Sequence, residues 1–375
     1  MDSHGAARTA RTARTEEQHR QDLAKIAKYR HLEDSIRAQA SANNYGSSLF
    51  QLTSKLLRSN PEYYTIWNVR RRCLISTLFS APSHTIPPER DSPSPTPAKN
   101  GTTADDKRRE DVGADIDTLQ SELAFTIPLL LEFPKCYWIW KYRRWLLEQA
   151  IVRLPAAVAR NIWEAELALA SKMLTKDRRN FHAWGYRRNV VAMLESPSLD
   201  GKSMVEDEFA YTRRMIKDDL SNFSAWHSRS QLILRLLDER DANDAARKVF
   251  LEGELDLVRE ALNVGPEDQS LWYYHQYLVS QIVNRTGQPT IAPALTTAER
   301  TAYVKKEIDD IKDLLEDYRD VKWIYESLLE YTIALKGFGE QVEDPAEWLA
   351  KVRALDPMRA GRWDDVEKQL AAPQH

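Results

Sequence analysis

The chain has 375 residues, of which 42% are hydrophobic and 29% charged, and its formal net charge is −3. This composition excludes an intrinsically disordered chain, and so small a net charge does not indicate a nucleic-acid-binding protein. The two cysteines, Cys73 and Cys136, are too few for a disulfide framework or a cysteine-based zinc site. Because the sequence has no apolar signal region and no run of about 18 apolar residues, we expect a cytoplasmic protein with no direct membrane insertion.

The first predicted element is a helix over about 16–40. Thr15 followed three residues later by Gln18 fits a capping box, in which each side chain accepts a hydrogen bond from the other residue's backbone N–H. We therefore expect residues 1–40 to form an N-terminal segment and helix, and residues 41–375 to form one repeat domain.

The repeat domain is built on a motif that recurs five times around a central tryptophan. An aromatic residue lies three positions before the tryptophan in four copies, an arginine lies three positions after it, and an apolar residue lies seven positions after it. The fifth copy has Gln269 and His275 at the first two of these positions. Such offsets share one side of a helix, so each copy predicts a helix that begins about four residues before its tryptophan. The central residues are Trp67, Trp140, Trp184, Trp226 and Trp272.

The residues just before each tryptophan also favour a helix start. Three copies have side chains that suit an N-cap, namely Asn180, Asn222 and Asp268. Three prolines just ahead of the predicted helices are residues typical of helix starts: Pro61, Pro134 and Pro266.

A second helix is predicted ahead of each of these helices. In all five copies, three sites at fixed offsets upstream of the tryptophan are apolar or aromatic, as Leu52, Leu56 and Leu57 are ahead of Trp67. Each copy is therefore a helical hairpin, and stacked hairpins bury one continuous core, which predicts an all-α superhelix. We expect the tryptophans and the preceding aromatic residues to pack in this core, and the arginines to tie neighbouring backbone ends together. A degenerate sixth hairpin is predicted around Trp323, which is out of register.

An insertion separates the first two copies. The stretch of chain from Trp67 to Trp140 is much longer than the stretch between any later pair of neighbouring central tryptophans. Residues 81–111 are rich in Pro, Ser and Thr and then in charged residues, so we expect a disordered surface loop there.

Lys135 is the candidate functional residue. The sequence contains no phosphate-binding GxxxxGK loop, no GxSxG elbow and no HExxH motif, and its eight histidines are scattered, so we expect no metal site in this chain. Lys135 follows Pro134 and stands just ahead of a predicted helix start, where backbone N–H groups and the helix dipole favour anions. A lysine there, beside Tyr137, can hold a phosphate or diphosphate. The alternative is an ordinary solvated surface lysine.

The repeat "N-(aromatic)-x-x-W-x-x-R-x-x-x-(apolar)" resembles that of the protein prenyltransferase α subunits, whose stacked hairpins form a right-handed superhelix, a crescent around a β subunit. Within that family the chain is most similar to the Rab (type II) geranylgeranyltransferase α subunits, in their compact fungal form. The segments that carry this likeness are "HGAARTARTARTEEQ", "DRRNFHAWGYRR", "NFSAWHSRS", "DQSLWYYHQYLV" and "ALDPMRAGRWDDV".

The resemblance implies a heterodimeric enzyme that transfers geranylgeranyl from geranylgeranyl diphosphate to the C-terminal cysteines of Rab GTPases, which an escort protein presents. The β subunit would hold the catalytic zinc. The family's diphosphate-contacting lysine falls at Lys135, and Tyr137 would shape the same rim. His4 would be able to reach the zinc of the partner and occlude the site, unless it is an inert residue of a flexible tail.

Two alternatives stay open. One is the α subunit shared by farnesyltransferase and geranylgeranyltransferase type I, which typically has a Gln three residues after this lysine, where our chain has Trp138. The other is a non-catalytic helical-repeat scaffold. Tetratricopeptide scaffolds have repeats of about 34 residues, which is shorter than the repeats of this chain.

Overall fold

The computed structural model describes residues 15–80, 104–284, 287–342 and 345–372, which form α-helices joined by turns and contain no β-strand. Two compact units are present, one made of residues 1–173 and 182–201 and the other of residues 174–181 and 202–375. The α-helices are α1 (Glu16–Ser41), α2 (Ser47–Ser59), α3 (Tyr64–Cys73), α4 (Ala104–Glu132), α5 (Tyr137–Arg153), α6 (Ala156–Lys176), α7 (Phe181–Leu194), α8 (Val205–Asp218), α9 (Phe223–Glu239), α10 (Asp244–Val264), α11 (Gln269–Val283), α12 (Thr297–Asp317), α13 (Lys322–Lys336), α14 (Ala346–Leu355) and α15 (Ala360–Ala371).

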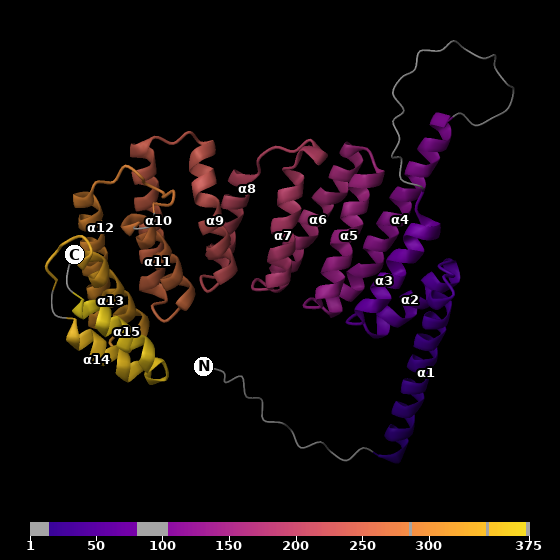
Figure 1. The fold of residues 1–375 in the computed structure, drawn as a ribbon, viewed down its shortest axis with the longest axis horizontal. Coiled ribbons are helices and arrows are strands. Elements are labelled where there is room, and N and C mark those ends of the chain that lie inside the picture. Colours follow the sequence, from indigo (N-terminus) through magenta and orange to yellow (C-terminus); the bar gives the residue numbers. More distant parts are fainter. Residues whose placement is uncertain (1–14, 81–103, 285–286, 343–344, 373–375) are drawn as a thin grey trace, which may run out of the picture. The chain divides into compact units, whose positions relative to one another are not determined.

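From α2 onward, successive helices pair as antiparallel hairpins (Figure 1). Helices α2 to α7 make three hairpins of the first unit, and helices α8 to α15 make four hairpins of the second. The predicted all-α architecture of stacked helical hairpins is therefore confirmed within each unit.

The N-terminal helix also agrees with the prediction. Helix α1 begins at Glu16 with a complete capping box, in which the Thr15 hydroxyl accepts from the Gln18 backbone N–H at 3.2 Å. The Gln18 side chain in turn accepts from the backbone N–H of Thr15 at 3.1 Å. These bonds satisfy N–H groups that a helix start otherwise leaves unpaired.

The predicted loop over residues 81–111 is only partly tested. Residues 81–103 lie outside the described part of the chain, but residues 104–111 form the first two turns of α4, so the loop prediction is wrong for them. The charged run from 105 to 111 contains no Gly or Pro, and Asp105 and Asp106 lie in the first turn, where negative charge complements the helix dipole.

The second helix of each of the first five hairpins begins at the same distance from its central residue. Helices α3, α5, α7, α9 and α11 all start three residues before their tryptophan. Asn222 and Asp268 are N-caps, as predicted, and accept from the backbone N–H groups of Ala225 and Ser270. The three prolines lie in the turns just ahead of the helices: Pro61, Pro134 and Pro266.

The turn position of these prolines is linked to the tryptophans. The indole N–H of Trp67 donates to the Pro61 carbonyl at 2.8 Å, and Trp140 makes the same bond to Pro134 at 2.9 Å. In the second unit Trp272 donates to the carbonyl of Pro266 at 2.6 Å. The proline carbonyl is thus an acceptor that closes the hairpin turn over the indole ring.

The tryptophans form the core, but the aromatic residues before them do not. The five central tryptophans are at most 4% exposed. The predicted core aromatics, however, have exposed fractions between 49% and 65%, so that prediction is wrong. Each is the first residue of its helix, and because Cα–Cβ bonds tilt toward the helix N-terminus, its side chain projects over the turn. These residues are Tyr64, Tyr137, Phe181 and Phe223.

The repeated arginine joins neighbouring hairpins through a buried carboxylate. Arg70 of α3 donates to both carboxylate oxygens of Glu122 in α4, each at 2.6 Å, and also to Thr53 at 3.0 Å. Tyr142 of α5 donates its hydroxyl to the same Glu122 at 2.5 Å. Burial, and then the Glu122 carboxylate, raise the pKa of Tyr142 well above its ordinary value, so this phenol stays a donor. We call this arrangement the Arg–Glu–Tyr junction.

The junction recurs along the chain. In the first unit it comprises Arg143, Glu166 and Tyr186. In the second unit Arg229, Glu254 and Tyr274 form it. The arginines were expected to tie neighbouring backbone ends together, but at these three positions they join neighbouring hairpins through a glutamate side chain.

The junction glutamates follow a regular spacing that our sequence analysis missed. Glu122 precedes Trp140 by the same offset that separates Glu166 from Trp184 and Glu254 from Trp272. The first helix of each of these hairpins therefore carries its acceptor at a fixed place in the repeat.

The sixth hairpin is regular once its central residue is identified as Tyr325 instead of Trp323. Helix α13 starts three residues before Tyr325, whose hydroxyl donates to the Arg319 carbonyl at 2.8 Å, as the indoles do in other copies. Glu307 precedes Tyr325 by the junction offset, and its carboxylate lies 2.9 Å from the His275 imidazole. Trp323 is out of register because a tyrosine has taken the central position.

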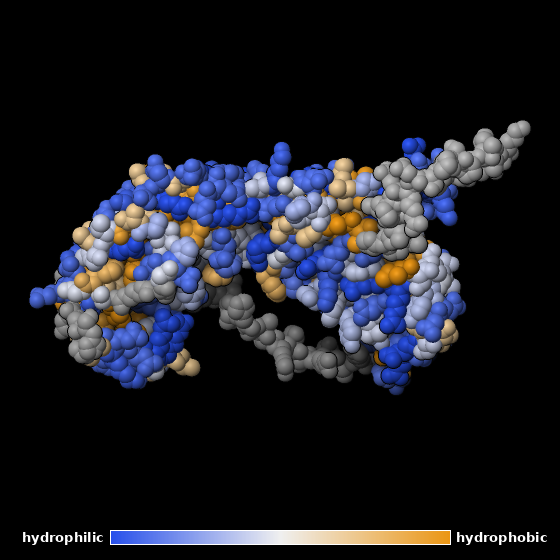
Figure 2. Space-filling model, turned by 45° about the horizontal axis from the view of Figure 1, so that its top comes forward, coloured by the Kyte–Doolittle hydropathy of each residue, from blue (hydrophilic) through white to orange (hydrophobic). Residues whose placement is uncertain are grey.

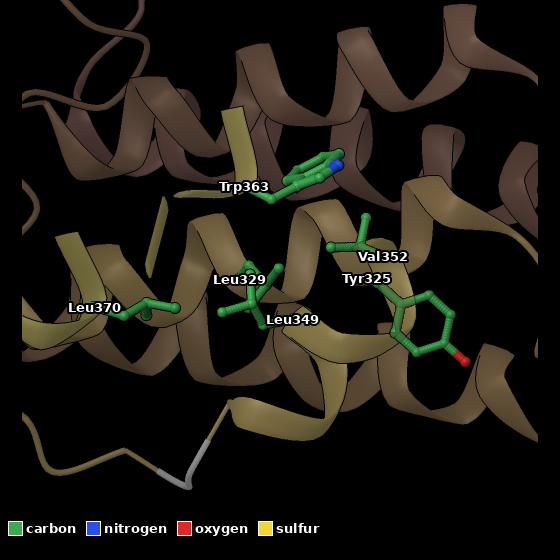
Figure 3. Close-up of a cluster of buried hydrophobic side chains, with 6 residues drawn as sticks. All are labelled: Tyr325, Leu329, Leu349, Val352, Trp363 and Leu370. Atoms are coloured by element: carbon green, nitrogen blue, oxygen red, sulfur yellow. The ribbon is translucent and has the colours of Figure 1, made fainter. Parts of the chain in front are cut away.

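A seventh hairpin, α14 with α15, ends the second unit. Trp363 lies three residues into α15 and donates to the Asp356 carbonyl at 3.0 Å. Its ring packs with Tyr325, Leu329, Leu349, Val352 and Leu370 in a cluster formed by α13, α14 and α15 (Figure 3).

No helix among the described residues is both long and apolar enough to cross a membrane. Figure 2 shows a largely hydrophilic surface with separate hydrophobic patches.

Candidate functional site

Lys135 lies where the sequence predicts it, in the turn between α4 and α5. It is exposed and stands two residues before Tyr137, the first residue of α5. Helix α5 has 17 residues, so its N-terminal turn carries the partial positive charge of the helix dipole toward the turn that holds Lys135. The lysine charge and the helix dipole therefore both attract an approaching anion.

Aromatic rings surround this turn in the first unit. The Tyr137 ring lies 5.1 Å from that of Trp138 and 6.2 Å from the imidazole of His182, centroid to centroid. Trp138 also contacts Tyr64 of the preceding hairpin at 5.2 Å. We call Tyr64, Tyr137, Trp138 and His182 the aromatic edge. It joins the starts of α3, α5 and α7, and about half of the Tyr64 and Tyr137 surface is exposed.

The charge of Lys135 acts on His182 of this edge. Burial lowers the pKa of His182, the positive charge of Lys135 lowers it further, and Glu62 of the first hairpin's turn acts in the opposite direction. The lowered pKa favours the neutral form of His182, so the positive charge near this edge comes from Lys135 and from Lys141, whose ammonium lies 5.7 Å from the Tyr137 and Trp138 ring centroids. The edge can bind an anion at Lys135 and an apolar group on its rings.

We expect the Lys135→Ala variant to raise the pKa of His182, because a nearby positive charge disfavours protonation of the imidazole. Glu62→Gln should lower the same pKa by removing a favourable negative charge. Both shifts can be measured from the pH dependence of the His182 ring protons in NMR spectra. If the His182 pKa is the same in both variants as in the unmodified chain, the two charges do not lie near this edge.

Neither cysteine has the properties of a nucleophile or metal ligand. Burial raises the pKa of Cys73 and of Cys136 to about 11, so both are thiols at neutral pH. Among the described residues no group of three or more His, Cys, Asp or Glu side chains is arranged to hold a metal ion. His4 lies outside the described residues.

Lys135 and Tyr137 lie two residues apart at the start of α5, and the structure places His182, which was not predicted as a site residue, 6.2 Å from Tyr137 between ring centroids. A signal was available. The position two residues before the central tryptophan is His182 in the third copy, whereas other copies have residues that do not titrate near pH 7: Thr65, Trp138, Ser224 and Ser270.

Comparison with known proteins identifies the repeat. The family model described as "Protein prenyltransferase alpha subunit repeat" matches residues 47–76, 119–150, 163–194, 205–236 and 251–282. These ranges fall on the first five hairpins and leave the sixth and seventh unmatched.

Full-length relatives give the same result. The chain is 32% identical over 359 residues to the geranylgeranyl transferase type-2 subunit alpha of Schizosaccharomyces pombe, covering 93% of each chain. The Saccharomyces cerevisiae protein of the same name is 32% identical over 285 residues, which is 76% of this chain and 74% of that one. A solved structure, Candida albicans protein geranylgeranyltransferase-I complexed with GGPP, shares the fold with a TM-score of 0.56 at 19% identity, over 92% of this chain and 91% of that chain.

Proposed function

Because the chain belongs to the protein prenyltransferase alpha subunit family, we propose that it is the α subunit of a type-2 geranylgeranyltransferase, active as a heterodimer with a β subunit. The observation that carries this proposal is the similarity to the fission-yeast type-2 α subunit over 93% of both chains. The substrates are geranylgeranyl diphosphate and the C-terminal cysteines of Rab GTPases, which an escort protein presents.

Exposed aromatic side chains support a β-subunit partner. Tyr64 and Tyr137 are exposed on the first unit, and Phe223 and Tyr273 are exposed on the second, where their rings lie 6.2 Å apart. Exposed aromatic residues in groups are typical of protein interfaces. Tyr64, Tyr137 and Phe223 are the first residues of second helices, and Tyr273 is the fifth residue of α11, so all four lie near the end of their hairpin that corresponds to the Lys135 turn.

Lys135 acts on the leaving group in the proposed reaction. The sulfur of the Rab cysteine attacks C1 of the prenyl chain, an S–C bond forms, and the C1–O bond breaks with its electron pair leaving on the diphosphate. Negative charge on the diphosphate therefore grows in the transition state, where the Lys135 ammonium stabilises it more than in the ground state. Tyr137 shapes the rim of the same site. A zinc ion held by the β subunit would supply the thiolate form of the cysteine.

Trp138 favours the type-2 enzyme over the α subunit shared by farnesyltransferase and geranylgeranyltransferase type I. Its ring packs against Tyr64 and Tyr137, so this position offers no side-chain amide to a C-terminal carboxylate. An enzyme that receives its substrate from an escort protein does not depend on that contact.

Reconstitution tests the proposal. The chain is co-expressed with a type-2 β subunit or with a CaaX-type β subunit, and the heterodimers are isolated by size exclusion. Transfer of labelled geranylgeranyl to a Rab protein is then measured with and without escort protein, using the chain alone as the control. We expect a stable type-2 heterodimer and escort-dependent transfer. A heterodimer with the CaaX-type β subunit that modifies CaaX peptides would instead support the shared α subunit, and failure to bind either would leave a scaffold.

A further inference from the structure

Lys141 places a second ammonium group on the aromatic edge. It follows Tyr137 by four residues and Trp138 by three, so the three side chains share one face of α5. The Lys141 nitrogen lies 5.7 Å from the centroid of each ring, and the side chain is exposed. Because Cα–Cβ bonds tilt toward the N-terminus of a helix, this side chain runs back along α5 toward the turn that holds Lys135.

No carboxylate among the described residues neutralises this ammonium. Lys141 makes no ion pair and no side-chain hydrogen bond with residues 15–80, 104–284, 287–342 or 345–372. By contrast, Arg144, which follows on the same helix, pairs with Glu148 at 3.0 Å. The rings of Tyr137 and Trp138 attract the charge of Lys141 but leave its N–H donors to a ligand.

The packing of the repeat does not require this lysine. The position directly after the central tryptophan has a different residue in every other copy, and in the third copy it is a glycine. The position of Lys135 likewise has a lysine in one copy only, and it is the same copy. Two lysines thus come together on the second hairpin, at the edge where positive charge already acts on His182. The residues that replace Lys141 in the other copies are Asn68, Gly185, His227 and Tyr273.

From these contacts we propose that Lys141 binds the terminal phosphate of geranylgeranyl diphosphate and thereby selects a diphosphate over a monophosphate. This assignment rests on the proposed prenyl transfer, in which Lys135 stabilises the charge that develops on the leaving group. Each of the two phosphate groups then has one ammonium, whereas a monophosphate has no second group for Lys141. The terminal phosphate is charged before the C1–O bond breaks as well as after, so Lys141 stabilises the bound substrate and the transition state about equally.

The test uses the heterodimer with a type-2 β subunit and equilibrium binding of labelled geranylgeranyl diphosphate and geranylgeranyl monophosphate. We expect Lys141→Ala to raise the Kd of the diphosphate at least about tenfold, through the loss of one charge-assisted contact. The Kd of the monophosphate should change by less than about threefold, and the single-turnover rate at saturating diphosphate by less than about twofold. Lys141→Arg keeps the charge and should keep the preference for the diphosphate. Lys55→Ala, which removes the same charge from the exposed surface of α2, is the matched control and should change neither Kd.

Three results would overturn the role of Lys141 while the unmodified heterodimer still transfers geranylgeranyl. Equal weakening of both ligands by Lys141→Ala would mean that this side chain only supports the rings of the edge. An unchanged Kd of the diphosphate would mean that the ammonium does not reach the substrate. Loss of the heterodimer on size exclusion would mean that the ammonium pairs with the β subunit instead. A heterodimer of the unmodified chain that neither binds the diphosphate nor transfers the prenyl group would overturn the proposed function, and this assignment with it.

Discussion

Lys135→Ala is expected to lower the single-turnover rate of geranylgeranyl transfer by about 10²–10³-fold, the usual cost of removing one group that stabilises charge in a transition state. Lys135 stands in the turn before α5, and the α5 dipole acts on an anion in the same direction. The loss should appear mainly in the rate at saturating substrate, because diphosphate charge grows as the C1–O bond breaks. Rapid-quench measurement with labelled geranylgeranyl diphosphate gives this rate directly.

Two controls make this result specific. Lys55→Ala removes the same charge from the exposed surface of α2 in the same unit and should leave the rate unchanged. Lys135→Arg keeps the charge and should retain more activity than Lys135→Ala. The heterodimer should form normally with all three variants, because an exposed turn lysine adds little to folding stability. Unchanged turnover of Lys135→Ala would remove this residue from the mechanism without removing the chain from its family.

Glu122→Ala is expected to reduce the free energy of unfolding by about 3–5 kcal/mol, because it leaves a buried guanidinium without its counter-charge. Arg70 is 2% exposed, and Glu122 accepts from two of its three guanidinium nitrogens and from the Tyr142 hydroxyl. The remaining side-chain partners of Arg70, Thr53 and Ser54, are neutral. Urea denaturation followed by circular dichroism measures the difference.

Glu148→Ala is the matched control in the same unit. Glu148 pairs with Arg144 one turn away on α5 at 3.0 Å, and both side chains are about half exposed. Removing an exposed pair of this kind should cost less than about 1 kcal/mol. Equal effects of the two substitutions would mean that the Arg–Glu–Tyr junction contributes no more than an ordinary surface ion pair.

The sequence predicts those parts of the fold that depend on local patterns. The tryptophan register and the capping box at Thr15 place helix starts correctly, because both depend on residues within one or two turns. The glutamates of the junctions were missed, since Glu122 is meaningful only beside Arg70, which lies far away in the sequence, in another hairpin. Tyr325 was missed because the more conspicuous Trp323 stands two residues before it.

The sequence indicates only part of the candidate site, because only part of it depends on a local pattern. Lys135 is conspicuous because its position in the motif has a lysine in one copy only. His182 belongs to a different copy, and its relation to Lys135 requires that the starts of α5 and α7 lie together in space. The exposure of Tyr64 and Tyr137 likewise depends on which way a first-turn side chain projects, which hydrophobicity alone does not specify.

The Arg–Glu–Tyr junction has a consequence for how such a chain can lengthen. The second hairpin contributes Glu122, which accepts from the hairpin before it, and Arg143, which donates to Glu166 of the hairpin after it. One hairpin therefore supplies the acceptor of one junction and the donor of the next junction. Duplicating such a segment in the gene adds an acceptor and a donor together, so no buried charge is left unpaired. Gain or loss of whole hairpins is then tolerated, whereas gain or loss of half a hairpin is not.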